Sequence, residues 1–268
     1  MRAFAAACLA VAVMASSARA DDIARLMQAL RFAETVGIMR TEGLRYGGDV
    51  GKEMLDDAER ARWGHVVDKV YDDEVMLAKV SMRFSEAMAG ADVATLLAFF
   101  EGPGAEIVAL ELVARRALLD DAVEAAAEAV YARMAAEGTP LVGQVNEIIA
   151  DSDLTERNVA AALNANLAFY RGLADGGGLD MSEAEMLADI WEQEDEMRQQ
   201  TGDWLRAYLV MAYEPLAAET LEEYAGLWRS AAGRDLNRAL FAAYDAMYED
   251  LSYRLGLAVA VQMQGEDL

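Results

Sequence analysis

The chain has 268 residues, and its 47 acidic side chains outnumber 23 basic ones, which gives a formal net charge of -24 at pH 7. Such a negative field repels phosphate backbones and anionic lipid, so we expect no nucleic acid partner. Cations, basic peptides and neutral surfaces remain possible partners. The single cysteine, Cys8, excludes a disulfide framework.

Residues 1–20 have the pattern of a secretory signal peptide. Arg2 supplies a positive start, an apolar run follows as far as Met14, and Ala18 and Ala20 are the small residues that signal peptidase requires. The apolar run is too short for a hydrocarbon layer about 30 Å thick. We therefore expect cleavage near Ala20 and export to the periplasm.

The mature chain would begin near Asp21 without Cys8, so it would contain no cysteine and no thiol chemistry. Loss of Arg2 and Arg19 would leave 21 basic against 47 acidic side chains, a difference of -26. No later stretch approaches the apolar length of a membrane span, so we expect a soluble mature protein without a transmembrane segment.

The periodicity of the remaining chain predicts an all-α fold. Apolar residues recur at three- and four-residue spacing, and only three prolines interrupt them. Alanine and glutamate, both strong helix formers, are abundant. No stretch alternates in the manner of a β-strand.

The first segment, residues 21–138, is predicted to contain five helices after the signal peptide. A glycine-rich turn should follow its first helix, and its third helix is rich in methionine and aromatic residues. In chain order we expect a helix from Asp22 to Tyr46 ended by Gly47-Gly48, a charged helix, a third ending near Met88, a short one over Asp92–Phe100, a break at Gly104 and a long helix over Ala105–Ala136.

The second segment, residues 139–268, is predicted to repeat that order. Glycine and proline in Gly138-Thr139-Pro140 mark the boundary between the segments. We expect a helix capped by Asp153 and ended by glycines 176–178, a helix with a Ser182–Glu185 capping box, a third ending near Tyr213, a short one over Ala218–Trp228, a break at Gly233 and a long helix over Arg234–Met263.

Distinctive residues of the two segments fall into register at an offset of about 129 positions. Internal repetition of this kind indicates two tandem helical repeats. The matching groups are Gly43-Leu44 with Gly172-Leu173, Gly47-Gly48 with Gly176-Gly177, Phe99 and Gly104 with Trp228 and Gly233, and Ala129-Val130 and Met134 with Ala258-Val259 and Met263.

Several of these stretches resemble the uncharacterised exported family called domain of unknown function 2059. The resemblance lies in the aromatic and glycine break of residues 99–104 and 227–233, in residues 107–111 and 114–120, and in Glu42-Gly43-Leu44-Arg45-Tyr46-Gly47. Gly102 stands where the family often has serine. The resemblance implies an all-helical exported domain in two tandem copies, without a known activity.

No catalytic, cofactor-binding or metal-binding residue is predicted. His65 is the only histidine and therefore the only candidate base for a triad, but it lies in a charged stretch that favours a surface position. The acidic clusters at residues 72–74 and 192–196 lack the spacing of di-iron or calcium sites, so we interpret them as solvated faces.

Other polar residues are interpreted structurally. Glu111 and Arg115 lie four residues apart and predict an ion pair on one helix face. Asn164, Asn166 and Asn237-Arg238 are expected to bond between helices, with a pocket lining as the alternative.

The methionine and aromatic stripes include Met82 with Phe84, Met211 with Tyr213 and Met247 with Tyr248. They favour core packing, with an apolar cleft between the segments as the rarer possibility.

Three hypotheses of function follow. The first is a non-catalytic module, not an enzyme, that binds a protein or peptide partner in the cell envelope. The alternative is a carrier of an apolar ligand bound between the two repeats. The weakest is a metal-assisted hydrolase that uses surface carboxylates.

Overall fold

A computed structural model describes residues 19–57 and 59–264. This part of the chain is helical throughout apart from its turns and has no strand, which confirms the predicted all-α class. The signal peptide prediction falls on residues 1–20, of which 1–18 lie outside the described residues. Residues 19–29 are helical, and Arg19 donates from Nη2 to the carbonyl oxygens of Met88 at 3.2 Å and Ala91 at 2.9 Å.

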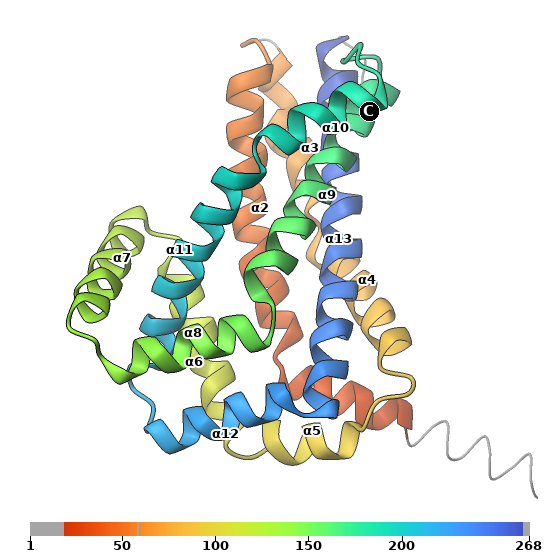
Figure 1. The fold of residues 1–268 in the computed structure, drawn as a ribbon. Coiled ribbons are helices and arrows are strands. Elements are labelled where there is room, and N and C mark those ends of the chain that lie inside the picture. The colour runs from red at the N-terminus through yellow and green to blue at the C-terminus, as the bar shows by residue number, and fades with distance from the viewer. Residues whose placement is uncertain (1–18, 58, 265–268) are drawn as a thin grey trace, which may run out of the picture.

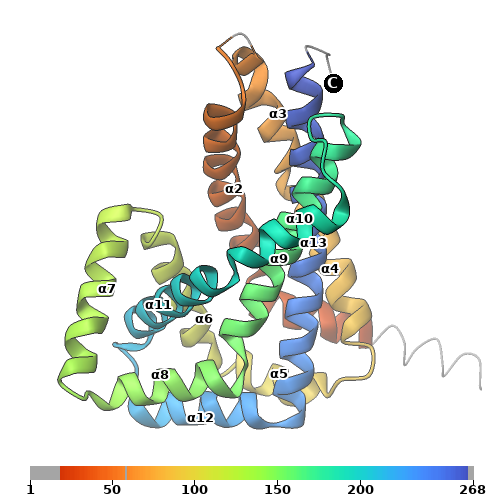
Figure 2. The same cartoon turned by 45° about the horizontal axis from the view of Figure 1, so that its top comes forward.

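The labelled helices follow one another with short connections (Figures 1 and 2). Their bounds are α2 Phe32–Met54, α3 Trp63–Val70, α4 Asp73–Ala87, α5 Val93–Phe100, α6 Gly104–Ala117, α7 Asp121–Ala136, α8 Pro140–Asp151, α9 Leu154–Asp175, α10 Glu183–Glu192, α11 Glu194–Tyr213, α12 Ala218–Arg229 and α13 Ala231–Met263, with a 3-10 helix at Glu59–Arg62.

Helix α13 is the central element of the fold. It packs along α9 of its own segment and against α4 of the first segment (Figure 1). A β-carbon at Gly172 would lie 2.1 Å from the carbonyl oxygen of Tyr253, and one at Gly256 would lie 2.1 Å from that of Phe169. The two helices therefore touch backbone to backbone, and one cluster of buried side chains extends through both segments.

The prediction that Gly47-Gly48 ends the first helix is wrong. Helix α2 continues to Met54, and Gly43, Gly47 and Gly51 lie on the face toward α3. An added β-carbon at these positions would lie 2.2 Å from Tyr71, 2.6 Å from Val67 and 2.2 Å from Trp63, respectively. These glycines allow close contact between two helices, whereas Gly176-Gly177-Gly178 does follow the end of α9, with a positive φ of 75° at Gly177.

Two predicted long helices of the first segment are interrupted. Arg31 has a φ of 52°, so the helix expected over residues 22–46 breaks between residue 29 and Phe32. The helix expected over Ala105–Ala136 divides into α6 and α7, where the Asp120 side chain accepts a hydrogen bond from the Ala122 amide and starts a new helix. Its counterpart α13 is continuous, and Gly233 lies in its first turn.

Most of the other predicted boundaries are confirmed. Helix α4 ends at Ala87, α11 ends at Tyr213, and the Ser182–Glu185 capping box is present. Asp153 precedes α9 but makes no capping hydrogen bond with its side chain, because its φ of 53° turns the chain sharply out of α8. The two tandem repeats remain a prediction.

Within the described residues, no single helix has both the length and the apolar composition needed to span a membrane. Helices α5 and α6 meet those criteria only when taken together, and a bend of 71° separates them.

Candidate ligand cavity between the two segments

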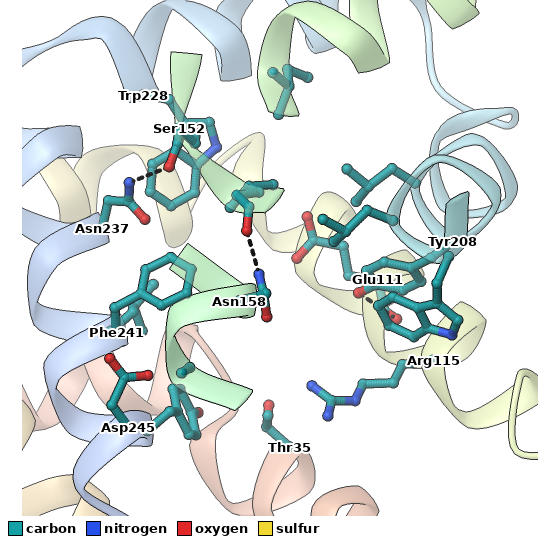
Figure 3. A pocket seen from close by; sticks show the side chains of 18 of the residues that line it. Thr35, Glu111, Arg115, Ser152, Asn158, Tyr208, Trp228, Asn237, Phe241 and Asp245 are labelled. Atoms are coloured by element: carbon teal, nitrogen blue, oxygen red, sulfur yellow. Dashed lines mark hydrogen bonds between the residues drawn. The ribbon is translucent and has the colours of Figure 1, made fainter. Parts of the chain in front are cut away.

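A partly open cavity of about 350 Å³ lies between the two segments. Helices α2 and α6 of the first segment face α8, α9, α11, α12 and α13 of the second across it (Figure 3). Small-molecule sites typically measure about 300–1000 Å³. An adjoining hollow of about 170 Å³ shares Glu111, Arg115 and Tyr244 with this cavity.

Aromatic side chains form a large part of the cavity wall, with eight of the 22 lining residues. Trp204 stacks on Tyr208 with ring centroids 5.0 Å apart, and Tyr224 lies edge-on to Trp228 at 5.5 Å. The aromatic residues that line the cavity are Trp204, Tyr208, Tyr213, Tyr224, Trp228, Phe241, Tyr244 and Tyr248.

Methionine contributes little to this wall. Met39 lines the cavity, whereas Met247 is buried in the core and Met82 is exposed. Of the methionine and aromatic stripes, the cavity therefore contains Tyr213 and Tyr248, with more tyrosine and tryptophan than methionine in its lining.

Glu111 on α6 lies at the junction of the cavity and the adjoining hollow. Its Oε1 accepts hydrogen bonds from the hydroxyl of Tyr213 at 2.6 Å and from that of Tyr224 at 3.0 Å. Burial raises the pKa of the Glu111 carboxyl, and these two hydrogen bonds only partly oppose the rise. Contacts from α11 and α12 thus fix a carboxyl group of the first segment.

Arg115 lies one helical turn beyond Glu111, but the ion pair predicted between them is wrong. Its Nε and Nη2 donate to the two carboxylate oxygens of Glu42 on α2, at 2.9 and 2.8 Å. Such a bidentate pair is stronger and better oriented than a single contact. The pair ties α6 to α2 beside the cavity, and the guanidinium points toward its centre (Figure 3).

Asp245 lies on the α13 wall of the cavity. Burial raises the pKa of its carboxyl to about 6, with a further contribution from Glu249, while Arg157 on α9 opposes both. Arg157 itself contacts Asp153 at 3.9 Å and lies over the Phe241 ring at 5.3 Å.

Ser152, between α8 and α9, brings an unpaired hydroxyl to the cavity. The residue is 4% exposed, and its Oγ has no hydrogen-bond partner within the described structure. Its carbonyl oxygen accepts a hydrogen bond of 2.9 Å from the Asn237 side chain. Asn158 also lines the cavity, and its amide donates to the carbonyl oxygen of Leu154 at 2.7 Å (Figure 3).

The asparagines that the sequence singled out have different positions. Asn237 lines the cavity and also bonds between helices, so both expectations hold for it. Asn164 is exposed, Asn166 is partly buried, and neither lines the cavity. Arg238 pairs with Asp235 on its own helix.

His65 is exposed, as predicted, and it is not among the residues that line this cavity. It borders a separate groove between α3 and α13 together with Lys69 and Arg254.

The acidic clusters have structural partners. Glu194 and Asp195 pair with Arg198, and Asp72 caps α4 through the Val75 amide. Across residues 19–57 and 59–264, no three His, Cys, Asp or Glu side chains gather in a way that would hold a metal ion.

Sequence reasoning missed Glu42, Ser152 and Asp245. For Asp245 a signal existed: Asn237, Phe241 and Asp245 recur every four residues beside the apolar stripe of α13. Residues four apart lie on one face of a helix, so a cavity lined by Asn237 would also meet Asp245. Glu42 and Ser152 gave no such signal, because their roles depend on contacts with other helices.

No family model, curated protein or solved structure matches the chain. The resemblance to domain of unknown function 2059 therefore stays a prediction that rests on the residues quoted for it.

Proposed function

We propose that the chain is a non-catalytic binding protein that holds a small molecule with an apolar or aromatic body between its two segments. The observation that carries this proposal is the cavity of about 350 Å³, in which polar groups from α6, α9 and α13 converge among aromatic rings. Concave, largely apolar sites with a few oriented polar groups are typical of ligand binding.

The side chains of the cavity favour binding over catalysis. Among the described residues, Ser152 has the one serine hydroxyl of the lining, and no base is bonded to it, so nothing there activates it as a nucleophile. Glu111 is held by two tyrosines and Arg115 by Glu42, which suits fixed recognition rather than proton transfer.

A cavity lined by polar groups from both segments supports the carrier hypothesis over the protein- or peptide-interaction module that the sequence favoured. A protein can bind both a small ligand and a protein partner. Within the part of the chain that the structure describes, however, no surface supports the interaction-module hypothesis as specifically as the cavity supports the carrier hypothesis. The metal-assisted hydrolase gains no support from the geometry of the acidic clusters.

The proposal is tested by filling the cavity. Ala161 on α9 lines it, whereas its neighbour Ala160 is exposed. We expect the wild-type protein to bind the neutral probe 4-phenylbutanol in isothermal titration calorimetry, Ala161→Phe to lose this binding, and the matched control Ala160→Phe to retain it. Absence of binding to the wild-type protein, or equal binding to both variants, would contradict the proposal.

We further propose that this protein acts in the periplasm after removal of residues 1–20. The support is the pattern of those residues. N-terminal sequencing of protein recovered from the periplasmic fraction should give a chain that begins at Asp21, and an intact N-terminus would contradict the proposal.

A further inference from the structure

We infer that the ligand of this cavity carries a cationic ammonium group attached to its apolar or aromatic body. The inference rests on the proposed function and adds the charge of the ligand to it. It is carried by the charges that line the cavity, by their partners and by the rings around them.

Two carboxyl groups line the cavity, and among the described residues neither Glu111 nor Asp245 belongs to an ion pair. Glu111 is bonded by two neutral hydroxyls. The Arg157 guanidinium contacts Asp153 at 3.9 Å, and its charge acts on the Asp245 carboxyl without an ion-pair contact. A desolvated carboxylate without a counter-charge is costly, and a bound cation removes that cost.

Arg115, the cationic side chain among the described lining residues, already has an ion-pair partner. Arg115 is held in a bidentate pair by Glu42, so the Glu42, Arg115, Glu111 and Asp245 side chains together carry more negative than positive charge when ionised. An anionic ligand would have to compete with Glu42 for Arg115 while approaching two other carboxyl groups. A cationic ligand would also approach Arg115, but Glu42 offsets that charge and the two other carboxyl groups would attract the ligand.

The aromatic wall favours the same charge. Faces of tryptophan and tyrosine attract ammonium groups, and desolvated cation–π contacts are among the stronger ones. Trp204, Tyr208 and Trp228 contribute such rings to the lining, and the Phe241 ring already lies under the Arg157 guanidinium.

Two features add to this preference. Ser152, buried to 4% exposure, offers a hydroxyl oxygen that accepts no hydrogen bond in the described structure, while an ammonium group has three donors to place. The net charge of -24 also attracts cations toward the molecule and repels anions.

Three probes with one body and different charges test the inference at pH 7.5. They are 4-phenylbutylamine, 4-phenylbutanol and 4-phenylbutyrate, each titrated into the purified protein by calorimetry. We expect the amine to bind about tenfold more tightly than the alcohol, and the carboxylate to bind more weakly than either.

Substitution of the two carboxyl groups locates the preference. Asp245→Asn and Glu111→Gln should each reduce the affinity for the amine several-fold and leave that for the alcohol within twofold. Glu222→Gln, which removes one exposed carboxylate of α12 away from the cavity, should change neither. Far-UV circular dichroism checks that each variant is folded. Because the two substitutions lie on different helices, one folded variant still tests the inference if the other fails to fold.

The outcomes separate the two proposals. Binding of the alcohol with equal or better binding of the carboxylate would overturn the inference and leave the proposed function intact. An amine preference unchanged by both substitutions would overturn it as well. Failure of all three probes to bind folded wild-type protein would overturn the proposed function, and the inference with it.

Discussion

Glu111 illustrates how a single side chain acquires its role from other helices. Its spacing on α6 predicts an ion pair with Arg115. Its carboxyl group instead accepts hydrogen bonds from the hydroxyls of Tyr213 and Tyr224, about 100 residues further along the chain. Both tyrosines are buried, at 2% and 4% exposure. A buried donor that loses its acceptor costs more than the hydrogen bond itself contributes.

Glu111→Leu is therefore expected to lower the free energy of unfolding by about 2 kcal/mol or more, because it leaves two buried hydroxyl groups unpaired. Glu111→Gln keeps an amide oxygen as acceptor and should cost less than about 1 kcal/mol. Urea unfolding followed by circular dichroism measures both. Equal stability of the two variants would show that the tyrosine contacts do not contribute.

Asp245 gives a prediction for pH dependence. Its pKa of about 6 in the folded chain exceeds the ordinary value of 3.8, so between those values the folded state binds the proton more strongly than the unfolded state. The stability contributed by this group is therefore greatest below pH 3.8 and falls as the pH rises through 6. Two charged residues act on the Asp245 carboxyl: Glu249 raises its pKa, and Arg157 lowers it.

Asp245→Asn removes this penalty, so the variant should gain stability over wild type as the pH rises from 4 to 6 and keep that gain above. Allowing for solvent screening of a half-buried side chain, we expect about 1 kcal/mol, or about 2–4 °C in Tm. Thermal unfolding at pH 4 and pH 7.5 tests it, with Glu222→Gln as control. A gain of the same size at both pH values would refute the assignment.

At the scale of elements, glycine decides how closely helices pack. Gly172 on α9 and Gly256 on α13 place each backbone within the space of the other's missing side chain. Both α9 and α13 also contribute residues to the cavity wall. The glycines of α2 likewise allow α3 to pack closely against it, although their sequence pattern resembles the end of a helix.

Gly172→Ala should destabilise the chain by about 2 kcal/mol or more, because a β-carbon 2.1 Å from a carbonyl oxygen forces the two helices apart. Gly226→Ala is the matched control within α12, where the new methyl group meets nothing within 4 Å and helix propensity should add up to about 1 kcal/mol. Denaturant unfolding compares them, and a neutral Gly172→Ala would mean that the contact is looser than described.

At the scale of the whole molecule, the two segments share one core. Helix α13 packs on α4, and α11 packs on α6 and α7, so each segment covers apolar surface of the other. The sequence boundary at Gly138 is a local turn, with a φ of 66°, and not a boundary between separate cores.

We therefore expect the chain to unfold as one cooperative unit. Differential scanning calorimetry should show a single transition whose calorimetric and van't Hoff enthalpies agree. Two resolved transitions, assignable to residues 21–138 and 139–268, would show that the segments are independent domains despite their contacts.

The sequence by itself determined the helical class, most helix ends and the surface position of His65, because these follow from periodicity, capping residues and local charge. It also indicated a signal peptide and two tandem repeats, which stay predictions. Only the tertiary structure decided that Gly47 packs and does not stop a helix, that Arg115 pairs with Glu42, and that Asp245 and Ser152 line a cavity. The reason is physical: those properties arise from contacts between residues distant in the chain, and local pattern carries no information about which faces meet.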